Sequence, residues 1–530
     1  MPHRPTLRRR LPLLILVGLL SACSTAPRSN SIPVLPTRGA AALPPIAYVF
    51  DKQHTDARLL LNRLSWGANA SSAAQMQALG MDRYLDLQLR ARNSIVPDAI
   101  QAQINALSIS QKPFETMMRE LEVQKTAADA QKGIDDGLRK AYQQELNRLA
   151  REAASRSVLR EVYSSAQLQE QMTWFWMNHF NIHSGKHNLR AMLGDFEESA
   201  IRPFALGNFH DLLRATMYHP AMLRYLDNEF NASQRINENY ARELLELHTM
   251  GVNSGYSQHD IQELARALTG LAINVSRDTP KMRPELKPFY VRQALFEFNP
   301  QRHDFGDKHI LGQTIAGRGL PEIEDIINLL CRQPATAHFI SLQLATYFVS
   351  DTPTEALVNA MARSFLASDG SIPATLRVMF DAPEFHASLG HKFKDPLHYA
   401  VGAVRLAYDG NNIVNPGPVL NWLNQMGQPF NGHQTPDGYL MTESAWASPG
   451  QLAQRFDIAR SIGSGTPALF YPPDLPRPSD KPPAPALLGS AYAQSWSQSF
   501  SVESRQALQQ AGAKNEWNVF FLAAPEMMRR

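Results

Sequence analysis

The chain has almost no cysteine. Only Cys23 and Cys331 occur among 530 residues, so a disulfide framework cannot hold the fold together. Cys331 follows an apolar helical segment, and we expect it to be a packed core thiol. Hydrophobic residues make up 44% of the chain, which is enough for one large core or two ordinary ones. Stability must therefore come from the burial of apolar side chains.

Several common catalytic signatures are also absent. The sequence has no Gly-x-Ser-x-Gly elbow, no phosphate-binding Walker loop, no Gly-x-Gly-x-x-Gly, no Cys-x-x-Cys and no His-Glu-x-x-His. Serine-hydrolase, nucleotide-binding, thiol-redox and zinc-protease functions therefore lose the patterns that usually indicate them.

Neither charge sign is in clear excess. The chain has 52 Lys and Arg against 49 Asp and Glu, and residues 1–22 hold four arginines and no acid. Without that segment 48 basic residues (52 less 4) stand against 49 acidic ones. Nucleic-acid binding requires a clustered basic excess, so we expect no nucleic-acid partner.

The N-terminal segment has the pattern of an export signal. Its apolar run, residues 11–20, is too short to span a membrane and follows basic residues, as in a signal peptide. Leu20-Ser21-Ala22-Cys23 resembles the lipobox of bacterial lipoproteins. The resemblance implies cleavage after residue 22, acylation of Cys23 by chains such as palmitate, and attachment to a membrane. By the same resemblance Ser24 favours the outer membrane; the alternative is an ordinary secretory signal with an incidental cysteine.

The rest of the chain divides into a tether and a domain. Residues 23–46 are rich in Ser, Pro, Ala and Thr and are expected to form a flexible tether. We treat residues 47–530 as one large domain, mainly α, with its helices in an orthogonal array. The proline-free run after Pro113, up to about residue 180, predicts two or three long helices whose charged middle is a solvated face. Strand periodicity is convincing only near residues 288–312, which predicts one small β-hairpin.

Other helices are expected from periodicity and breaker residues. Their ranges are 71–89, 321–332, 335–350, 353–368, 372–381, 395–409, 416–426, 448–461 and 500–523.

Residues 237–270 combine acids, amides and a histidine within a strong helical repeat. Gly251 is expected to end a first helix in a left-handed cap. Ser257, with Asp260 as its capping-box partner, starts a second helix that Gly270 ends. This stretch therefore predicts a helical hairpin with a charged edge.

Two interpretations of that edge stay open. Glu238, Arg242 and Glu246 lie four residues apart, so they are expected to form an ion-pair ladder along one helix, a structural network that needs no ligand. Glu263 and Arg266 could pair with the same ladder across the hairpin.

The alternative is an acid–base site. Its candidate residues are Glu243, Glu246, His248, His303, Asp304 and Lys308. In this hypothesis His303 is the base, Asp304 orients it and Lys308 stabilises an anion. The segment that contains the last three residues could equally form a hydrogen-bonded turn between strands.

A divalent metal is a further hypothesis, because carboxylate and imidazole mixtures suit iron, manganese or zinc. The candidate ligands are His179, Asp227, Glu243, Glu246 and His303. His179, His183 and His187 also recur at four-residue spacing, but Ser184-Gly185 interrupts the helix that would align them.

The segment Asn-Glu-Asn-Tyr-Ala-Arg-Glu-Leu-Leu-Glu-Leu-His-Thr-Met-Gly at residues 237–251 resembles the hallmark of the domain-of-unknown-function 1800 family. Further matching segments are residues 255–257, 263–270, 303–308, 176–180, 201–203, 219–223, 225–228, 394–396, 427–429 and 436–439. The resemblance implies an exported, mostly helical bacterial protein without an assigned activity. It also implies a possible partner, an exported protein that looks like phosphatases and sulfatases. It supplies no catalytic residues.

Three functions follow as hypotheses. The first, which we favour from the sequence, is a lipid-anchored envelope scaffold or assembly partner of another exported protein. The second is a periplasmic enzyme that depends on a metal or on acid–base residues. The third is a binding module for an envelope polymer, which predicts exposed aromatics such as Trp422 and Tyr439 along a groove.

Overall fold

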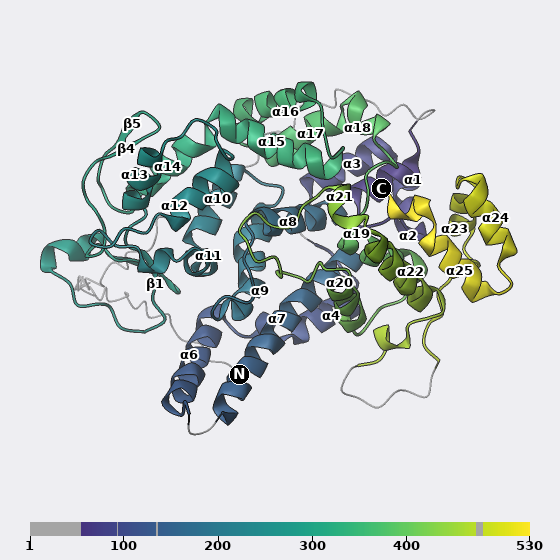
Figure 1. The fold of residues 1–530 in the computed structure, drawn as a ribbon, viewed down its shortest axis with the longest axis horizontal. Coiled ribbons are helices and arrows are strands. Elements are labelled where there is room, and N and C mark those ends of the chain that lie inside the picture. The colour runs from purple at the N-terminus through teal and green to yellow at the C-terminus, as the bar shows by residue number, and fades with distance from the viewer. Residues whose placement is uncertain (1–54, 93, 134–135, 473–480) are drawn as a thin grey trace, which may run out of the picture.

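The protein is described by a computed structural model that covers residues 55–92, 94–133, 136–472 and 481–530 (Figure 1). The signal segment 1–22, the tether 23–46 and Cys23 lie outside the described residues. The prediction of a mainly α fold is confirmed, since short strands are confined to one region between long runs of helices. None of the helices in the described part is both long enough and apolar enough to cross a membrane.

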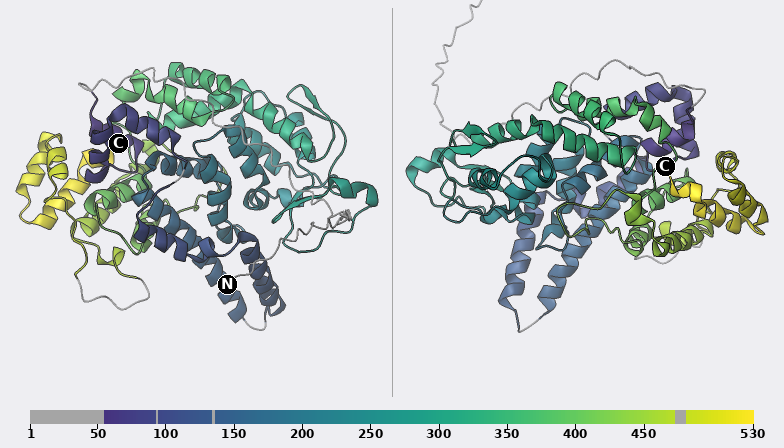
Figure 2. Two further views of the ribbon diagram at one scale, coloured as in Figure 1. Left: turned by 180° about the vertical axis from the view of Figure 1, so that it is seen from behind. Right: turned by 45° about the horizontal axis from the view of Figure 1, so that its top comes forward.

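Two antiparallel helices form an arm that projects from the body (Figures 1 and 2). They are α6 (Phe114–Ala130) and α7 (Gly137–Tyr163), and α8 (Gln167–His179) follows α7 into the body. This agrees with the expected long helices, but one part of the prediction is wrong. The outer half of α7 is solvated, whereas its last turns bury charged side chains, among them Arg156 and Glu161.

The helical hairpin forms as its caps predict. The first helix comprises α12 (Asn239–Glu243) and a π-helical turn, η5 (Leu244–Thr249), and Gly251 follows with φ +89°. Ser257 and Asp260 cap each other's backbone at the start of α13 (Gln258–Ala267). Local side chain–backbone hydrogen bonds fix these boundaries, so sequence was sufficient to place them.

The β structure is richer than the single predicted hairpin. The strands β1 (Leu271–Ile273), β2 (Val291–Gln293) and β3 (Phe296–Phe298) form an antiparallel sheet in the order β1-β3-β2. A separate hairpin pairs β4 (Lys308–Ile310) with β5 (Gln313–Ile315). Residues 299–307 therefore link two sheets and are not the turn of one hairpin.

Two predicted helices are each divided in the structure. The expected helix 71–89 is α2 (Ala70–Leu79) and α3 (Met81–Arg90), separated at Gly80, whose φ is +80°. The expected helix 500–523 is α24 (Val502–Gln510) and α25 (Lys514–Ala523).

The remaining helices complete the array around this framework. They are α1 (Ala57–Leu64), α4 (Asp98–Ala106), α5 (Ser108–Gln111), α9 (Leu193–Asp195), α10 (Phe209–Tyr218), α11 (Pro220–Tyr225), α14 (Pro321–Cys331), α15 (Pro334–Phe348), α16 (Glu355–Ala367), α17 (Ile372–Phe380), α18 (Pro383–Ala387), α19 (Pro396–Ala407), α20 (Gly417–Gln425), α21 (Glu443–Trp446), α22 (Pro449–Gly463) and α23 (Ala491–Ser497).

One hydrophobic cluster runs through the described chain, from Leu60 to Met528. The aromatic segment of α8 lies within it, with Phe175 and Trp176 fully buried, and Cys331 is buried in the same core as expected. Because α7, α8 and the chain that follows them pack into this cluster, their polar side chains are held where water has little access.

Candidate functional site

The predicted ion-pair ladder is present. Arg242 lies 3.2 Å from Glu238 and 3.5 Å from Glu246. All three side chains are partly exposed, so the ladder adds little to stability. Arg266 does not join it across the hairpin, because its guanidinium pairs with Glu263 at 2.7 Å and with Asp304 at 2.8 Å.

The structure places His303, Asp304 and Lys308 together but not in their predicted roles. Lys308 Nζ lies 2.6 Å from Glu322 Oε1, and His303 Nε2 lies 3.3 Å from the same oxygen, with all three side chains fully buried. His303 Nδ1 lies 2.7 Å from the Thr269 carbonyl, so this nitrogen donates. Asp304 pairs with Arg266 and does not orient His303, whose Nδ1 is bonded to the Thr269 carbonyl instead.

His248 and His179 face the core. The ring of His179 contacts the backbone carbonyl of His248 at 3.1 Å, and the two ring centroids are 6.2 Å apart. Burial lowers the pKa of His179 to about 4 and that of His248 to about 3. Both imidazoles are therefore neutral at pH 7, with aromatic neighbours such as Phe180.

Glu243 is half-buried and lies on another side of the hairpin. Burial raises its pKa, and the nearby Glu246 and Asp437 raise it further. Asp227 pairs with Lys186 at 2.8 Å. The predicted metal ligands thus lie in several separate environments. Within the described residues, no group of three or more His, Cys, Asp or Glu side chains is arranged to hold a metal.

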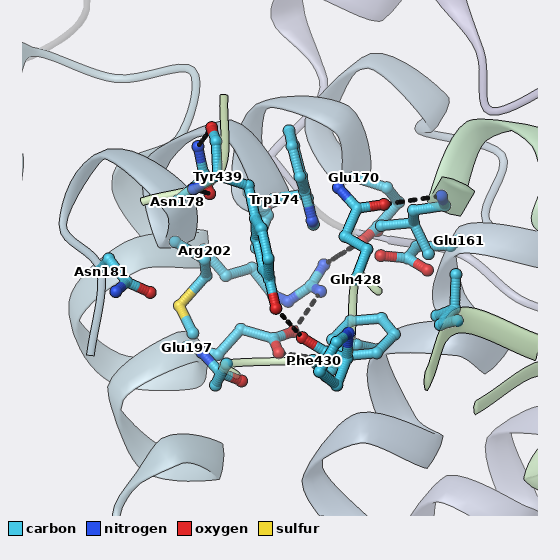
Figure 3. Close-up of a pocket in the computed structure, with 17 residues that line it drawn as sticks. Glu161, Glu170, Trp174, Asn178, Asn181, Glu197, Arg202, Gln428, Phe430 and Tyr439 are labelled. Carbon is cyan, nitrogen blue, oxygen red and sulfur yellow. Dashed lines mark hydrogen bonds and ion pairs between the residues drawn. The ribbon is translucent and has the colours of Figure 1, made fainter. Parts of the chain in front are cut away.

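A different set of side chains forms a polar cavity that the sequence did not suggest (Figure 3). Arg202 lies at its centre, between Glu170 and Glu197. One guanidinium nitrogen of Arg202 donates to both oxygens of Glu170 at 2.8 and 2.7 Å, and the other donates to Glu197 at 2.8 Å. The second oxygen of Glu197 accepts from the Ser157 hydroxyl.

Local structure explains why these groups converge. Ser157 and Glu161 lie one turn apart on α7, Glu170 lies in the first turn of α8, and Glu197 lies in the π-helical turn η2 (Phe196–Ile201). The wider turn of a π-helix re-aims side chains and is frequent at functional sites. Arg202 follows η2 directly, and its guanidinium reaches both Glu170 on α8 and Glu197 in η2.

Glu161 is the unusual member of the cavity. Its side chain is only 3% exposed, and its Oε2 has no hydrogen-bond partner among the described residues. Burial raises the pKa of Glu161 well above its usual value, and the neighbouring Glu197 and Glu170 raise it further. Burial would also raise the pKa of Glu197, but Arg202 holds that pKa below its usual value. The cavity therefore favours the protonated form of Glu161 and the ionised form of Glu197.

The cavity is small and is closed on one side by a strap, which we define as residues 428–439 between α20 and α21. Its water-accessible volume is about 40 Å³, room for about three water molecules. Aromatic lining comes from Trp174, Phe430 and Tyr439.

Two hydrogen-bond donors in the wall also lack a partner in the described part of the chain. They are Nε of Arg202 and Nε2 of Gln428. The Leu397 backbone N–H donates to Gln428 Oε1 at 2.9 Å, which fixes the amide orientation and directs Nε2 away from that bond. The three residues that carry these atoms, one acid and two donors, all line the same cavity.

Sequence reasoning missed this site for a clear reason. The segment that contains Glu161 was interpreted as a solvated face, because charge density alone does not distinguish the two halves of α7. A signal was nevertheless present. Glu170 directly precedes an aromatic core segment, and Arg202 lies in a matched motif, so both charges were candidates for burial.

Trp422 and Tyr439, the aromatics of the polymer-binding hypothesis, are not on an open groove. Trp422 is 7% exposed and packs in the core, and Tyr439 lines the cavity.

Comparison with known proteins adds a family and no activity. No curated protein and no solved structure matches this chain. The sequence profile of one family, described as "Protein of unknown function (DUF1800)", matches residues 59–529. That range includes the helical hairpin, every residue named in the cavity and the strap. The chain belongs to the DUF1800 family.

Proposed function

We propose that this protein is a cell-envelope enzyme that catalyses proton transfer in the cavity of Glu161, Glu197 and Arg202. One observation carries the proposal: Glu161, which is buried with an unpartnered Oε2 and a raised pKa, lines the same cavity as Glu197, whose pKa is lowered. Two carboxyl groups whose environments move their pKa values apart are a recurring acid–base arrangement. A purely structural ion network would have no need of a neutral acid without a hydrogen-bond partner.

The roles follow from protonation and position. Glu161 donates its proton to an oxygen of the ligand, and Glu197 accepts a proton from the ligand or from a cavity water. Transfer of that proton back to Glu161 restores both groups, so protons balance over a turnover. Arg202 keeps Glu197 ionised and holds both carboxylates in place.

The cavity also limits the ligand class. The guanidinium of Arg202 is already paired with Glu170 and Glu197, so the cavity wall offers no unpaired positive charge to an anionic ligand. The unsatisfied N–H groups of Arg202 and Gln428 require an acceptor atom. A neutral hydroxyl- or carbonyl-bearing group satisfies both conditions.

The first test measures protonation directly. Difference infrared spectra at pH 7 should contain the carbonyl stretch of a protonated carboxyl group, which Glu161→Gln removes. Glu198→Gln is the matched control, because Glu198 is the next carboxylate of η2 and pairs with Arg160 at 2.6 Å outside the cavity. Absence of the band from the wild-type protein would refute the assignment of Glu161 as the acid.

The second test measures activity. Neutral esters and glycosides are suitable substrates for a panel, because they carry acceptor oxygens without charge. Glu161→Gln should abolish any turnover and Glu198→Gln should retain most of it. Equal turnover by Glu161→Gln and the wild-type protein would exclude Glu161 from the chemistry.

The lipid anchor at Cys23 is part of the same proposal. A lipobox-like segment and a tether precede the domain, which supports attachment to the outer membrane. Replacement of Cys23 by serine should abolish incorporation of labelled palmitate and release the protein from the membrane fraction.

A second role, assembly with an exported phosphatase- or sulfatase-like protein, is supported by a separate surface. Val123 on α6 is 71% exposed and Phe230 is 56% exposed, and both line a broad groove between the arm and the body. Exposed apolar side chains in such a groove are typical of a protein contact. Val123→Arg and Phe230→Arg should each abolish cross-linking to such a partner in intact cells, whereas Val502→Arg, a change of an exposed residue on α24, should not.

A further inference from the structure

The cavity has one wall that is not part of the helical core. The helices α7 and α8 and the turn η2 form the inner walls and are buried in the main hydrophobic cluster. The strap forms the outer wall and supplies five lining residues: Gln428, Pro429, Phe430, Asn431 and Tyr439. It runs from α20 across the end of α8 to α21 (Figure 1). The inner part of the cavity has room for only about three waters, so a larger ligand can reach Glu161 only if a wall moves.

Backbone geometry allows the strap to be that wall. It contains no helix or strand, and a glycine with positive φ lies at each end, Gly427 at +79° and Gly438 at +71°. Gly438 also lets the strap approach α8 closely, since a Cβ there would lie 2.2 Å from the Asn178 carbonyl oxygen. Small residues at the ends of a segment are common hinges.

The partly buried side chains of Phe430 and Tyr439, together with polar contacts that water can replace, hold the strap to the body. The Asn178 side chain accepts from the amide of Tyr439 at 2.8 Å and donates to its carbonyl at 2.9 Å. Asn181 donates to the carbonyls of His433 at 3.1 Å and Thr435 at 2.7 Å. Because water substitutes for such bonds when a segment opens, each contributes only modestly to closure.

Gln428 connects the strap to the chemistry. Its amide oxygen is held by Leu397, and its Nε2 belongs, with Arg202 Nε, to the unsatisfied donors of the cavity. A ligand acceptor atom that binds Gln428 Nε2 would join the strap to the ligand and so to the buried core. Ligand binding would therefore favour the closed strap.

We propose that the strap, residues 428–439, is a lid that opens to admit the ligand, and that Gln428 binds an acceptor oxygen of a neutral ligand and closes the lid on it. This inference rests on the proposed function for the identity of the cavity as a ligand site. The opening of the strap can be measured without any assay of activity.

The test removes one contact that lies outside the cavity. Tyr225 donates its hydroxyl to the Gln434 carbonyl at 2.9 Å and does not line the cavity. Tyr225→Phe should accelerate hydrogen exchange of strap amides about fivefold, the effect of one lost hydrogen bond. Tyr218→Phe is the matched control, because Tyr218 also loses a partly buried hydroxyl bond, to Glu324, away from the strap.

The second measurement asks whether opening exposes the acid. Dicyclohexylcarbodiimide adds to protonated carboxyl groups, with the carboxyl oxygen bonding to its central carbon and the proton passing to its nitrogen. Labelling of Glu161, located by peptide mapping in the full protein, should rise in Tyr225→Phe by the same factor as strap exchange. Labelling in Tyr218→Phe should match that of the wild-type protein.

Each result decides one point. Strap amides that exchange as slowly as those of α8, or labelling that does not follow strap exchange, would overturn the lid. A neutral substrate from the panel should protect Glu161 from labelling by dicyclohexylcarbodiimide, and Gln428→Met should weaken this protection. Unchanged protection in Gln428→Met would overturn the role of Gln428. If labelling follows strap exchange but Glu161→Gln retains turnover, the lid stands and the proposed chemistry fails.

Discussion

Glu161→Gln should make the protein more stable at neutral pH, which is the opposite of the usual effect of changing a buried polar residue. Burial raises the pKa of Glu161 in the folded protein, so the folded protein holds this proton at higher pH than the unfolded chain, which releases it above pH 4.5. A carboxyl group whose pKa is raised in the fold contributes its full stabilisation below the unfolded-state pKa. This contribution to the free energy of unfolding is lost as pH rises toward the folded-state pKa. The loss is about 1.4 kcal/mol per pH unit over the range between the unfolded-state pKa and the folded-state pKa. Glutamine has nearly the same shape and no such dependence.

Urea denaturation followed by circular dichroism at several pH values would measure this. The free energy of unfolding of the wild-type protein, minus that of Glu161→Gln, should fall by about 1.4 kcal/mol per pH unit across this range. Glu198→Gln should keep the wild-type slope, because it leaves Glu161 in place. If Glu161→Gln is less stable than the wild-type protein at pH 7 and has an unchanged slope, Glu161 is ionised in the fold. The reasoning for the site would then be wrong.

Three further predictions concern parts of the fold that surround the site. Arg202→Leu removes the cation paired with buried Glu170 and one of the cations near Glu197, and it should cost about 3–5 kcal/mol in denaturation experiments. Arg242→Ala in the exposed ladder should cost at most about 1 kcal/mol, and equal costs would contradict the burial argument. In the fold His248 stays neutral down to about pH 3 and His179 down to about pH 4, whereas both imidazoles bind protons below pH 6.5 in the unfolded chain. The free energy of unfolding should therefore fall as pH drops from 6.5 to 4, by about 1.4 kcal/mol per pH unit for each imidazole. His248→Gln should reduce that slope by one proton, and an unchanged slope would show that His248 is protonated in the fold. Gly438→Ala should lower stability by about 1–3 kcal/mol and loosen the strap, because the added Cβ meets a backbone oxygen at a positive φ; Gly410→Ala, with φ +80° and open space, should cost about 1 kcal/mol.

The stability prediction also bears on function. Proteins commonly keep a destabilising group where activity needs it, so a variant that gains stability and loses turnover marks a functional residue. A stabilised Glu161→Gln variant with full activity would instead identify the acid as a dispensable defect of the core.

The sequence by itself determined those features that depend on near neighbours in the chain. The caps at Gly251 and Ser257 were predictable because the hydrogen bonds that form them span only a few residues. The ladder of Arg242 was predictable because residues four apart in a helix are neighbours. The mainly helical class followed for the same reason, since periodicity and breaker residues are local signals.

Tertiary structure alone decided the environment of each charge. His303 and Lys308 resembled an acid–base group in the sequence. In the structure both side chains contact the buried Glu322 of α14. Glu161 lies on a helix whose charge pattern resembled a solvated face, and it became a neutral acid only because α8, η2 and the strap exclude water from it. A carboxyl group's pKa depends on the solvent and charges within a few ångströms, and contacts between distant segments set both.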